Sequence, residues 1–140
     1  MDEVLVDTNI LVYAYQPAEI AKYSRAVDVV ETLTQNARGR LSAQVLAEFV
    51  NATTRKKEPL LSFDDAHRVV MLFIRSFVVL AVTEFVILEA LRGARDHQMS
   101  YYDAQIWATA KLHQIPTILT EDFTDGRVIE GVRFVNPFLH

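Results

Sequence analysis

The chain has 140 residues, of which 51% are hydrophobic and 23% are charged, and its formal net charge is −4. The length predicts a single domain spanning residues 1–140, and the composition is too apolar for an intrinsically disordered chain. The acidic balance argues against nonspecific binding of a phosphate backbone unless bound cations or local basic patches assist. There is no cysteine, which excludes disulfides and thiolate metal sites and favours a reducing, cytoplasmic setting.

Short apolar runs of strand length alternate with longer segments of helical period, which predicts an α/β fold with a mainly parallel sheet. The first half is expected to contain a strand at Val4–Val6, helices near Asn9–Tyr15 and Ser24–Gln35, a short strand at Arg40–Leu41 and a helix from Ser42 to about Lys56. The second half is expected to contain a helix beginning at Ser62, a strand at Phe77–Val82, helices from Thr83 to about Arg95 and from Ser100, and strands at Thr117–Thr120 and Val132–Val135.

Local signals support these boundaries. Ser62 with Asp65, and Ser100 with Asp103, have the spacing of a capping box, and Gly39 and Gly126 mark turns.

The longest apolar stretch, Val69 to Val82, is broken by Arg75 and Ser76 and is shorter than the roughly 20 residues of a membrane-spanning helix, so it is expected in the core. No basic segment followed by an apolar run opens the chain, so no signal peptide is expected.

Acidic residues follow two of the predicted strands. Asp7 comes directly after Val4–Val6, where an unpaired carboxylate in an apolar run is unfavourable, and Glu121 and Asp122 follow Thr117–Thr120. In open α/β sheets, ligands bind outside the carboxyl ends of the strands. These acidic residues are therefore expected to face one cleft.

Two further carboxylates lie on helices that can face the same cleft. Glu48 lies beside the buried stripe that is formed by Val45, Phe49 and Ala52. Asp103 lies in the first turn of a helix whose buried face is formed by Ile106, Trp107 and Ala110. Both side chains can reach the strand ends.

Each position also has a purely structural interpretation: Asp7 as a helix cap, Asp103 as a capping and dipole residue, Glu48 as a solvated flank residue and Asp122 as a turn residue. Together, however, four carboxylates in one cleft repel each other unless a cation neutralises them. An all-oxygen site suits Mg²⁺ or Mn²⁺, whereas Zn²⁺ favours His or Cys ligands. The four histidines lack ligand spacing and are expected at the surface or in packing: His67, His97, His113 and His140.

Four segments, VDTNILVY, LSAQVLAEFVN, SYYDAQIWATA and ILTEDF, resemble in order and spacing the acidic motifs of the PIN-domain ribonucleases, especially the VapC-like toxins of bacterial type II toxin–antitoxin pairs. The ending GRVIEGVRFVNPF is also similar to that of some members. The resemblance implies a three-layer α/β/α sandwich that binds one or two Mg²⁺ or Mn²⁺ ions and hydrolyses RNA with metal-activated water.

The same resemblance implies roles for particular residues. Carried over by motif, the core metal ligands are Asp7, Glu48 and Asp103, the fourth acid is Asp122 with Glu121 or Asp125 as alternatives, and the residues that orient Asp7 are Thr8 and Asn9. It also implies a small antitoxin protein whose C-terminal segment fills the cleft.

Other features bear on substrate and assembly. Candidate phosphate contacts, which can equally be solvated helix-end charges, are Arg38, Arg40, Arg55, Lys56, Lys57, Arg92 and Arg95. Tyr101 and Tyr102 can stack on a base or pack in the core. Eight Phe, five Tyr and one Trp exceed what one small core readily hides, which favours a homodimer.

Competing functions remain open. A non-catalytic PIN-like module that binds RNA or protein is the main alternative to a nuclease. A phosphatase with Asp7 as nucleophile is disfavoured because Asn9 stands where a second acid would be needed.

Overall fold

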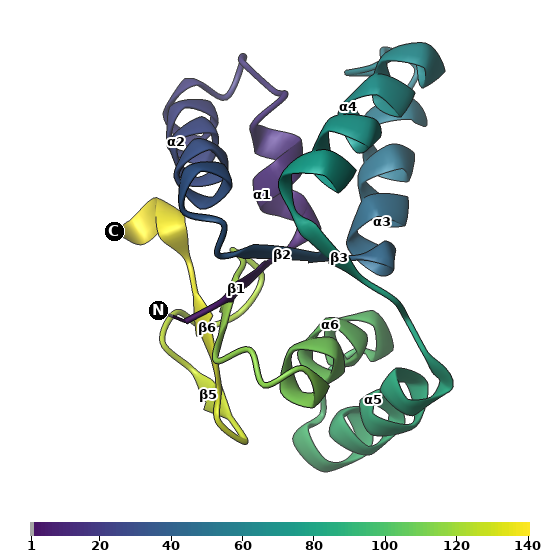
Figure 1. Cartoon of the computed structure of the whole chain (residues 1–140), viewed down its shortest axis with the longest axis vertical. Coiled ribbons are helices and arrows are strands. Elements are labelled where there is room, and N and C mark those ends of the chain that lie inside the picture. The colour runs from purple at the N-terminus through teal and green to yellow at the C-terminus, as the bar shows by residue number, and fades with distance from the viewer. Residues whose placement is uncertain (1) are drawn as a thin grey trace.

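A six-stranded sheet forms the centre of the computed structural model, which describes residues 2–140 (Figure 1). The strands are β1 (Val4–Val6), β2 (Gly39–Ser42), β3 (Val78–Leu80), β4 (Thr117–Leu119), β5 (Val128–Ile129) and β6 (Val132–Val135). Their order across the sheet is β3-β2-β1-β4-β6-β5, and every pairing is parallel except that of β5 with β6. The predicted α/β class with a mainly parallel sheet is confirmed.

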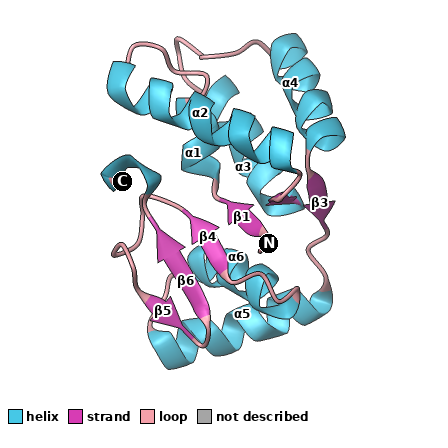
Figure 2. Cartoon of the chain, turned by 60° about the vertical axis from the view of Figure 1, so that its left-hand side comes forward, coloured by secondary structure: helices cyan, strands magenta, loops and turns pink. Residues whose placement is uncertain are grey.

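Helices cover both faces of this sheet. One layer consists of α1 (Thr8–Tyr13), α2 (Ile20–Asn36), α3 (Ala43–Thr54) and α4 (Phe63–Ser76), and the opposite layer consists of α5 (Glu84–His97) and α6 (Tyr101–Leu112) (Figures 1 and 2). A short 3₁₀ helix, η1 (Pro137–Leu139), ends the chain. The α/β/α sandwich that the resemblance implied is therefore present.

Hydroxyl side chains start several helices as the sequence predicted. Ser42 accepts a hydrogen bond from the backbone N–H of Val45, at 3.1 Å, and Ser62 accepts one from Asp65, also at 3.1 Å. Ser100 precedes α6, but its side chain makes no capping hydrogen bond, so the predicted capping box with Asp103 is wrong. The carboxylate of Asp103 lies instead at the cleft described below.

Several predicted boundaries differ from the structure, among them the turn expected at Gly39, the start of the second helix, and the strand expected at Phe77–Val82, which is shorter, at Val78–Leu80. Gly39 was expected in a turn but is the first residue of β2, where a Cβ atom would collide with the ring of Phe77, so glycine permits a close approach between β2 and the C-terminal end of α4. Gly126 does lie in a turn, with φ of 82°. The second helix begins at Ile20, four residues before the predicted start at Ser24. Its N-cap residue, Glu19, makes no side-chain capping hydrogen bond, so the sequence carried no capping signal for this start.

The apolar stretch 69–82 is only partly core, so that prediction is wrong in part. Phe73 and Phe77 are buried, whereas Leu72, Ile74 and Val78 are about half exposed, at 54%, 48% and 51%. The stretch covers the end of α4, whose outer face meets solvent, and β3, which is the edge strand of the sheet. No helix within residues 2–140 is both long enough and apolar enough to cross a bilayer.

Side chains of α5 and α6 bind the turn between β5 and β6. Trp107 of α6 donates its indole N–H to the backbone oxygen of Ile129, at 3.1 Å. The carboxylate of Glu130 accepts from Arg92 at 2.9 Å and Lys111 at 2.7 Å, and it contacts His97 at 2.6 Å. These contacts hold the β5–β6 turn against α6, the helix that carries Asp103.

We expect Glu130→Gln to lower the free energy of unfolding by about 1 kcal/mol near neutral pH. Hydrogen bonds from Arg92, and after it from Lys111 and His97, hold the pKa of Glu130 well below its usual range. A depressed carboxyl pKa gives stabilisation that is present above the unfolded value of about 4.5 and is lost as the pH falls below it. Urea unfolding of the wild type and of Glu130→Gln, near neutral pH and at about pH 3.5, measures how much of this stabilisation is lost at low pH.

The exposed loop carboxylate Glu58 provides the matched control. Glu58→Gln is expected to change stability by less than about 0.5 kcal/mol. If Glu130→Gln and Glu58→Gln behave alike, or if the loss at Glu130 is independent of pH, the ionised carboxylate of Glu130 does not stabilise the fold through its contacts with Arg92, Lys111 and His97.

Candidate active site

The carboxyl ends of β1 and β4 build the centre of the site. These strands are parallel neighbours, with Val6 opposite Leu119, so the residues that follow them emerge at the same edge of the sheet. The backbone N–H of Asp7 donates to the oxygen of Leu119, at 2.9 Å, which continues the pairing by one residue. The predicted meeting of Asp7 with the segment after β4 follows from this register.

Asp7 is both a helix cap and a member of the site. Its Oδ1 accepts the backbone N–H of Thr8 at 2.7 Å, which caps α1, and its Oδ2 accepts the hydroxyl of Thr120 at 2.8 Å. Its side chain is 8% exposed, and this burial raises the pKa of Asp7 to about 6 despite the two hydrogen bonds, with smaller contributions from the charges of Asp122 and Glu48. A nearby cation would remove much of this penalty.

Asn9 fixes the position of Asp122. Its Nδ2 donates to Asp122 Oδ2 at 3.1 Å and to Thr120 Oγ1 at 3.3 Å, and its Oδ1 accepts the backbone N–H of Glu121 at 3.4 Å. Partial burial raises the pKa of Asp122, and the charges of Asp103 and Glu121 raise it further. Asp122 therefore lies within electrostatic reach of Asp103.

Glu48 and Asp103 approach from helices in opposite layers. The hydroxyl of Thr8 donates to Glu48 Oε2 at 3.1 Å, which places Glu48 of α3 beside Asp7. Asp103 lies in the first turn of α6. Between these helices the Nε2 of Gln44 donates to the backbone oxygen of Tyr102, at 3.0 Å, and so connects α3 to α6.

The four predicted carboxylates line one cleft of about 420 Å³. Its complete lining is Asp7, Thr8, Asn9, Val12, Tyr13, Gln16, Gln44, Glu48, Asn51, Ala52, Arg55, Tyr102, Asp103, Ile106, Glu121 and Asp122. The lining contains no histidine.

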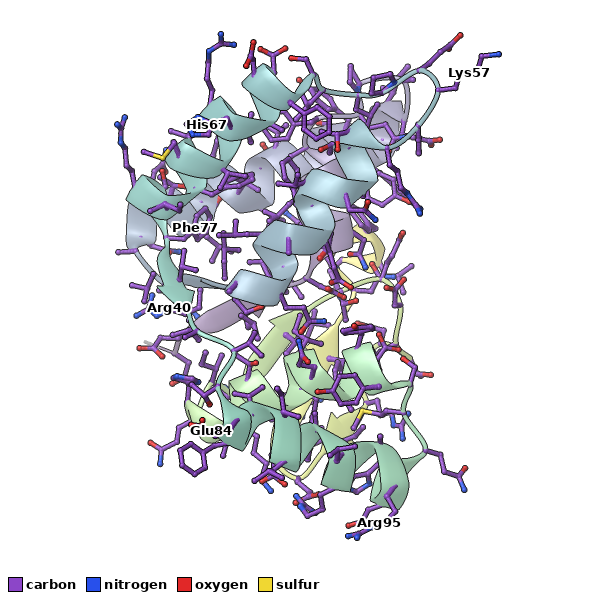
Figure 3. The ribbon with its side chains drawn as sticks, turned by 90° about the vertical axis from the view of Figure 1, so that its right-hand side faces the viewer. Arg40, Lys57, His67, Phe77, Glu84 and Arg95 are labelled. Atoms are coloured by element: carbon purple, nitrogen blue, oxygen red, sulfur yellow. The ribbon has the colours of Figure 1, made fainter. Side chains whose placement is uncertain are left out.

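The predicted basic and aromatic contacts separate into two groups. Arg55 is the only basic residue in the cleft lining, and Tyr102, which is 63% exposed, also lines the cleft. Arg40 pairs with Glu3 at 3.0 Å, on the side of the sheet where β1 and β2 begin, away from the cleft. Figure 3 shows Lys57 and Arg95 projecting from opposite ends of the molecule. Most of the predicted basic residues therefore do not gather at the cleft.

The two alternatives for the fourth acid have other partners. Glu121 lines the cleft, but its carboxylate accepts from Lys22 and from the hydroxyl of Tyr13, both at 2.8 Å. Asp125 does not line the cleft; it accepts the backbone N–H of Asn136 at 2.8 Å and pairs with His140 at 2.9 Å. The geometry therefore favours Asp122 over both alternatives.

The donor atoms at the cleft fit a hard divalent cation. In the present side-chain positions, no group of three or more His, Cys, Asp or Glu within residues 2–140 is arranged to hold a metal ion. The available donors are nevertheless oxygens, and Asp7 and Asp122 have pKa values raised by burial and by neighbouring carboxylates. These are the conditions that Mg²⁺ or Mn²⁺ relieves, and the side chains would have to draw closer around such an ion.

Three contributors to the site were not assigned a role from sequence. Thr120 bonds Asp7 and, through its hydroxyl, also accepts the backbone N–H of Asp122 at 3.1 Å. The sequence did contain a signal for Thr120: it is a polar residue at the carboxyl end of a predicted strand, next to the acidic residues Glu121 and Asp122. Gln44 and Lys22 gave no comparable signal, because their partners lie far along the chain.

The fold and the site together define an α/β/α domain with an acidic cleft at the carboxyl edge of its sheet. The family model of the PIN domain matches residues 4–124, and the chain belongs to the PIN domain family. The resemblance read from the four acidic motifs is thereby confirmed.

Solved structures of the same fold include proteins of toxin–antitoxin complexes. A toxin–antitoxin complex from Klebsiella pneumoniae matches with a TM-score of 0.72 at 20% identity, over 96% of this chain and 98% of the other. FitAcB from Neisseria gonorrhoeae matches with a TM-score of 0.63 at 22% identity, over 96% and 98%. VapC20 from Mycobacterium tuberculosis, described as a sarcin–ricin loop cleaving toxin, matches with a TM-score of 0.64 at 20% identity, over 86% and 90%. No protein with a curated description matches significantly.

Proposed function

We propose that this PIN domain is a metal-dependent endoribonuclease and the toxin of a toxin–antitoxin pair. The observation that carries the proposal is the convergence of Asp7, Glu48, Asp103 and Asp122 from separate elements on one cleft. The likeness to VapC structures, one of them described as cleaving the sarcin–ricin loop, supports RNA as the substrate class.

The chain's own residues would hold the ion and the substrate. Asp7, Glu48, Asp103 and Asp122 would be the ligands of Mg²⁺ or Mn²⁺, and these ions would supply activation of water and neutralisation of charge on the scissile phosphate. Hydrogen bonds from Thr8, Asn9 and Thr120 orient the carboxylates around the cleft. No side-chain nucleophile is needed for this chemistry.

Substrate contacts are assigned to the exposed residues of the same lining. Arg55 would bind a phosphate next to the scissile bond, and the exposed ring of Tyr102 would stack on an unpaired base. Tyr101 contacts the Tyr102 ring edge-on, with centroids 5.3 Å apart, which restricts the orientation of Tyr102.

Two partners accompany this proposal. A small antitoxin would insert a segment into the acidic cleft. An apolar cavity of about 580 Å³ between α2 and α4, with Phe73 and Phe77 in its lining, would be a second binding site for the same antitoxin. A second copy of the chain would cover the apolar side chains exposed on α5: Phe85, Leu88 and Leu91. A monomer mass in sedimentation equilibrium would reject the homodimer.

Cleavage of a structured RNA pool by the purified protein tests the proposal. We expect cleavage with Mg²⁺ or Mn²⁺ and none after EDTA removes the metal. Intact RNA in the presence of bound metal would contradict the nuclease and favour a PIN-like module that binds RNA or protein without cutting it.

We expect Arg55→Gln to weaken RNA binding about 3- to 10-fold and to lower the slope of log K against log salt by about one. The reason is that Arg55 is the only basic residue in the lining of an otherwise acidic cleft. Fluorescence anisotropy of labelled RNA, measured with Ca²⁺ in place of Mg²⁺ to suppress cleavage, gives both quantities.

Arg38 supplies the control for this experiment. It donates to the backbone oxygen of Asp2 at the opposite edge of the sheet, so Arg38→Gln removes the same charge without touching the cleft. Equal weakening by both variants would show that net charge, and not a contact in the cleft, holds the RNA.

A further inference from the structure

Glu121 is a fifth carboxylate in the cleft lining, and it differs from the other four in its partners. Lys22 Nζ lies 2.8 Å from Glu121 Oε2, and the hydroxyl of Tyr13 donates to Glu121 Oε1 at 2.8 Å. Lys22 Nζ also donates to the Tyr13 hydroxyl at 3.3 Å, so that each of the three side chains is hydrogen-bonded to the other two. Within residues 2–140, no other carboxylate of the cleft lining makes a salt bridge.

Aromatic rings hold the ammonium of Lys22 in place. It lies 4.8 Å from the ring centroid of Tyr13 and 5.6 Å from that of Phe138, and these two rings meet edge-on at 5.3 Å. Phe138 belongs to η1, which is itself tied to α2 by a 2.9 Å hydrogen bond from Arg25 to the backbone oxygen of Pro137. The side chain of Lys22 is 41% exposed, but its ammonium has defined partners in Glu121 and the two aromatic rings.

The charge balance of the cleft depends on this position. Its lining contains five carboxylates and one arginine, and divalent-ion affinity rises with the number of ligand charges. Glu121 adjoins Asp122 in the chain, close enough to add to the negative potential there. Lys22 and Tyr13 occupy both of its carboxylate oxygens, which leaves Asp122 as the available acid of this segment.

We propose that Lys22 is a positioning residue that keeps Glu121 out of the metal-binding set and so limits the cleft's affinity for the divalent ion. The inference rests on the proposed function, because it presumes that the other four carboxylates bind metal. The consequence is a site set by four carboxylates, whose ion exchanges more readily than it would with five.

Titration calorimetry of the RNA-free protein with Mn²⁺ tests the proposal independently of cleavage. Lys22→Met is expected to tighten Mn²⁺ binding about 3- to 10-fold or to add a second ion, because Glu121 then carries an uncompensated charge at the cleft. Lys22→Arg retains the charge and is expected to bind within about twofold of the wild type. Arg75→Met removes an exposed charge at the end of α4 and serves as the matched control.

The dependence on Glu121 decides the interpretation. In a Glu121→Gln background, Lys22→Met is expected to have no tightening effect. Unchanged or weaker binding by Lys22→Met, or tightening that persists without Glu121, would overturn the inference. Absence of Mn²⁺ binding by the wild-type protein would overturn the proposed metal site and this inference together, whereas normal wild-type binding with an unaffected Lys22→Met variant overturns the inference alone.

Discussion

Replacing Asp7 with asparagine is expected to raise the free energy of unfolding of the metal-free protein by about 1–2 kcal/mol at neutral pH. Burial raises the pKa of Asp7 from 3.8 to about 6, so the ionised carboxylate destabilises the folded chain. Asparagine removes the charge, but its single amide oxygen can accept only one of the two hydrogen bonds that the carboxylate accepts, from the backbone N–H of Thr8 at 2.7 Å and from the hydroxyl of Thr120 at 2.8 Å, which offsets part of the gain.

The pH dependence identifies the cause. Because its pKa is higher in the folded state, Asp7 binds more proton there than in the unfolded chain between about pH 4 and 6, so wild-type stability falls as the pH rises through that window. The advantage of Asp7→Asn should therefore vanish near pH 4 and be complete above about pH 6. Urea unfolding in EDTA across this range measures it.

Asp125→Asn is the matched control, since it also removes one negative charge. The backbone N–H of Asn136, together with His140, lowers the pKa of Asp125, so its neutralisation is expected to destabilise the protein.

Adding Mn²⁺ in place of EDTA should raise the urea midpoint of the wild type but not that of Asp7→Asn. A loss of stability in Asp7→Asn at neutral pH would show that its hydrogen bonds outweigh the burial of its charge.

The gathering of the acidic residues was predictable because it follows from local periodicities. Asp7 and Asp122 follow parallel neighbouring strands, whose carboxyl ends must share an edge of the sheet. Glu48 and Asp103 lie on helical faces that the 3.6-residue repeat already turns toward the core. Neither step required knowledge of a long-range side-chain contact.

The partners of these residues were not predictable, because they depend on pairs that are distant in the chain. Lys22 and Glu121 are 99 residues apart, and Gln44 and Tyr102 are 58 apart. No period in the sequence links such positions. Gly39 shows the same limit: glycine commonly marks a turn, but here the aromatic ring of Phe77 demands it within a strand.

Solvent exposure along 69–82 failed to follow composition for a related reason. The hydrophobic residues are continuous in the sequence, but an α-helix distributes them around its axis, so Phe73 faces the core while Leu72 and Ile74 face outward. Composition alone cannot distinguish a buried run from a helix with apolar residues on both faces. Such an exposed face is where a partner chain would pack.

Single amide substitutions of the acidic residues should divide them sharply by their effect on RNA cleavage. Under the proposed function, the substitutions Asp7→Asn, Glu48→Gln, Asp103→Asn and Asp122→Asn are each expected to lower kcat/KM at least about 100-fold, because each removes a charged oxygen from a shared metal site. Glu121→Gln is expected to stay within about tenfold of the wild type, since Lys22 and Tyr13 already hold that carboxylate.

Asp122 is the decisive member of this series, because three acids stand close together after β4. Its position depends on a 3.1 Å hydrogen bond from Asn9, whereas Asp125 is tied to the backbone of Asn136 and lies outside the cleft lining. Asp125→Asn, assayed well below its unfolding midpoint, should therefore retain activity. Inactivation by Glu121→Gln or Asp125→Asn with an active Asp122→Asn variant would move the fourth acid to that residue and would require the loop after Thr120 to rearrange when RNA binds.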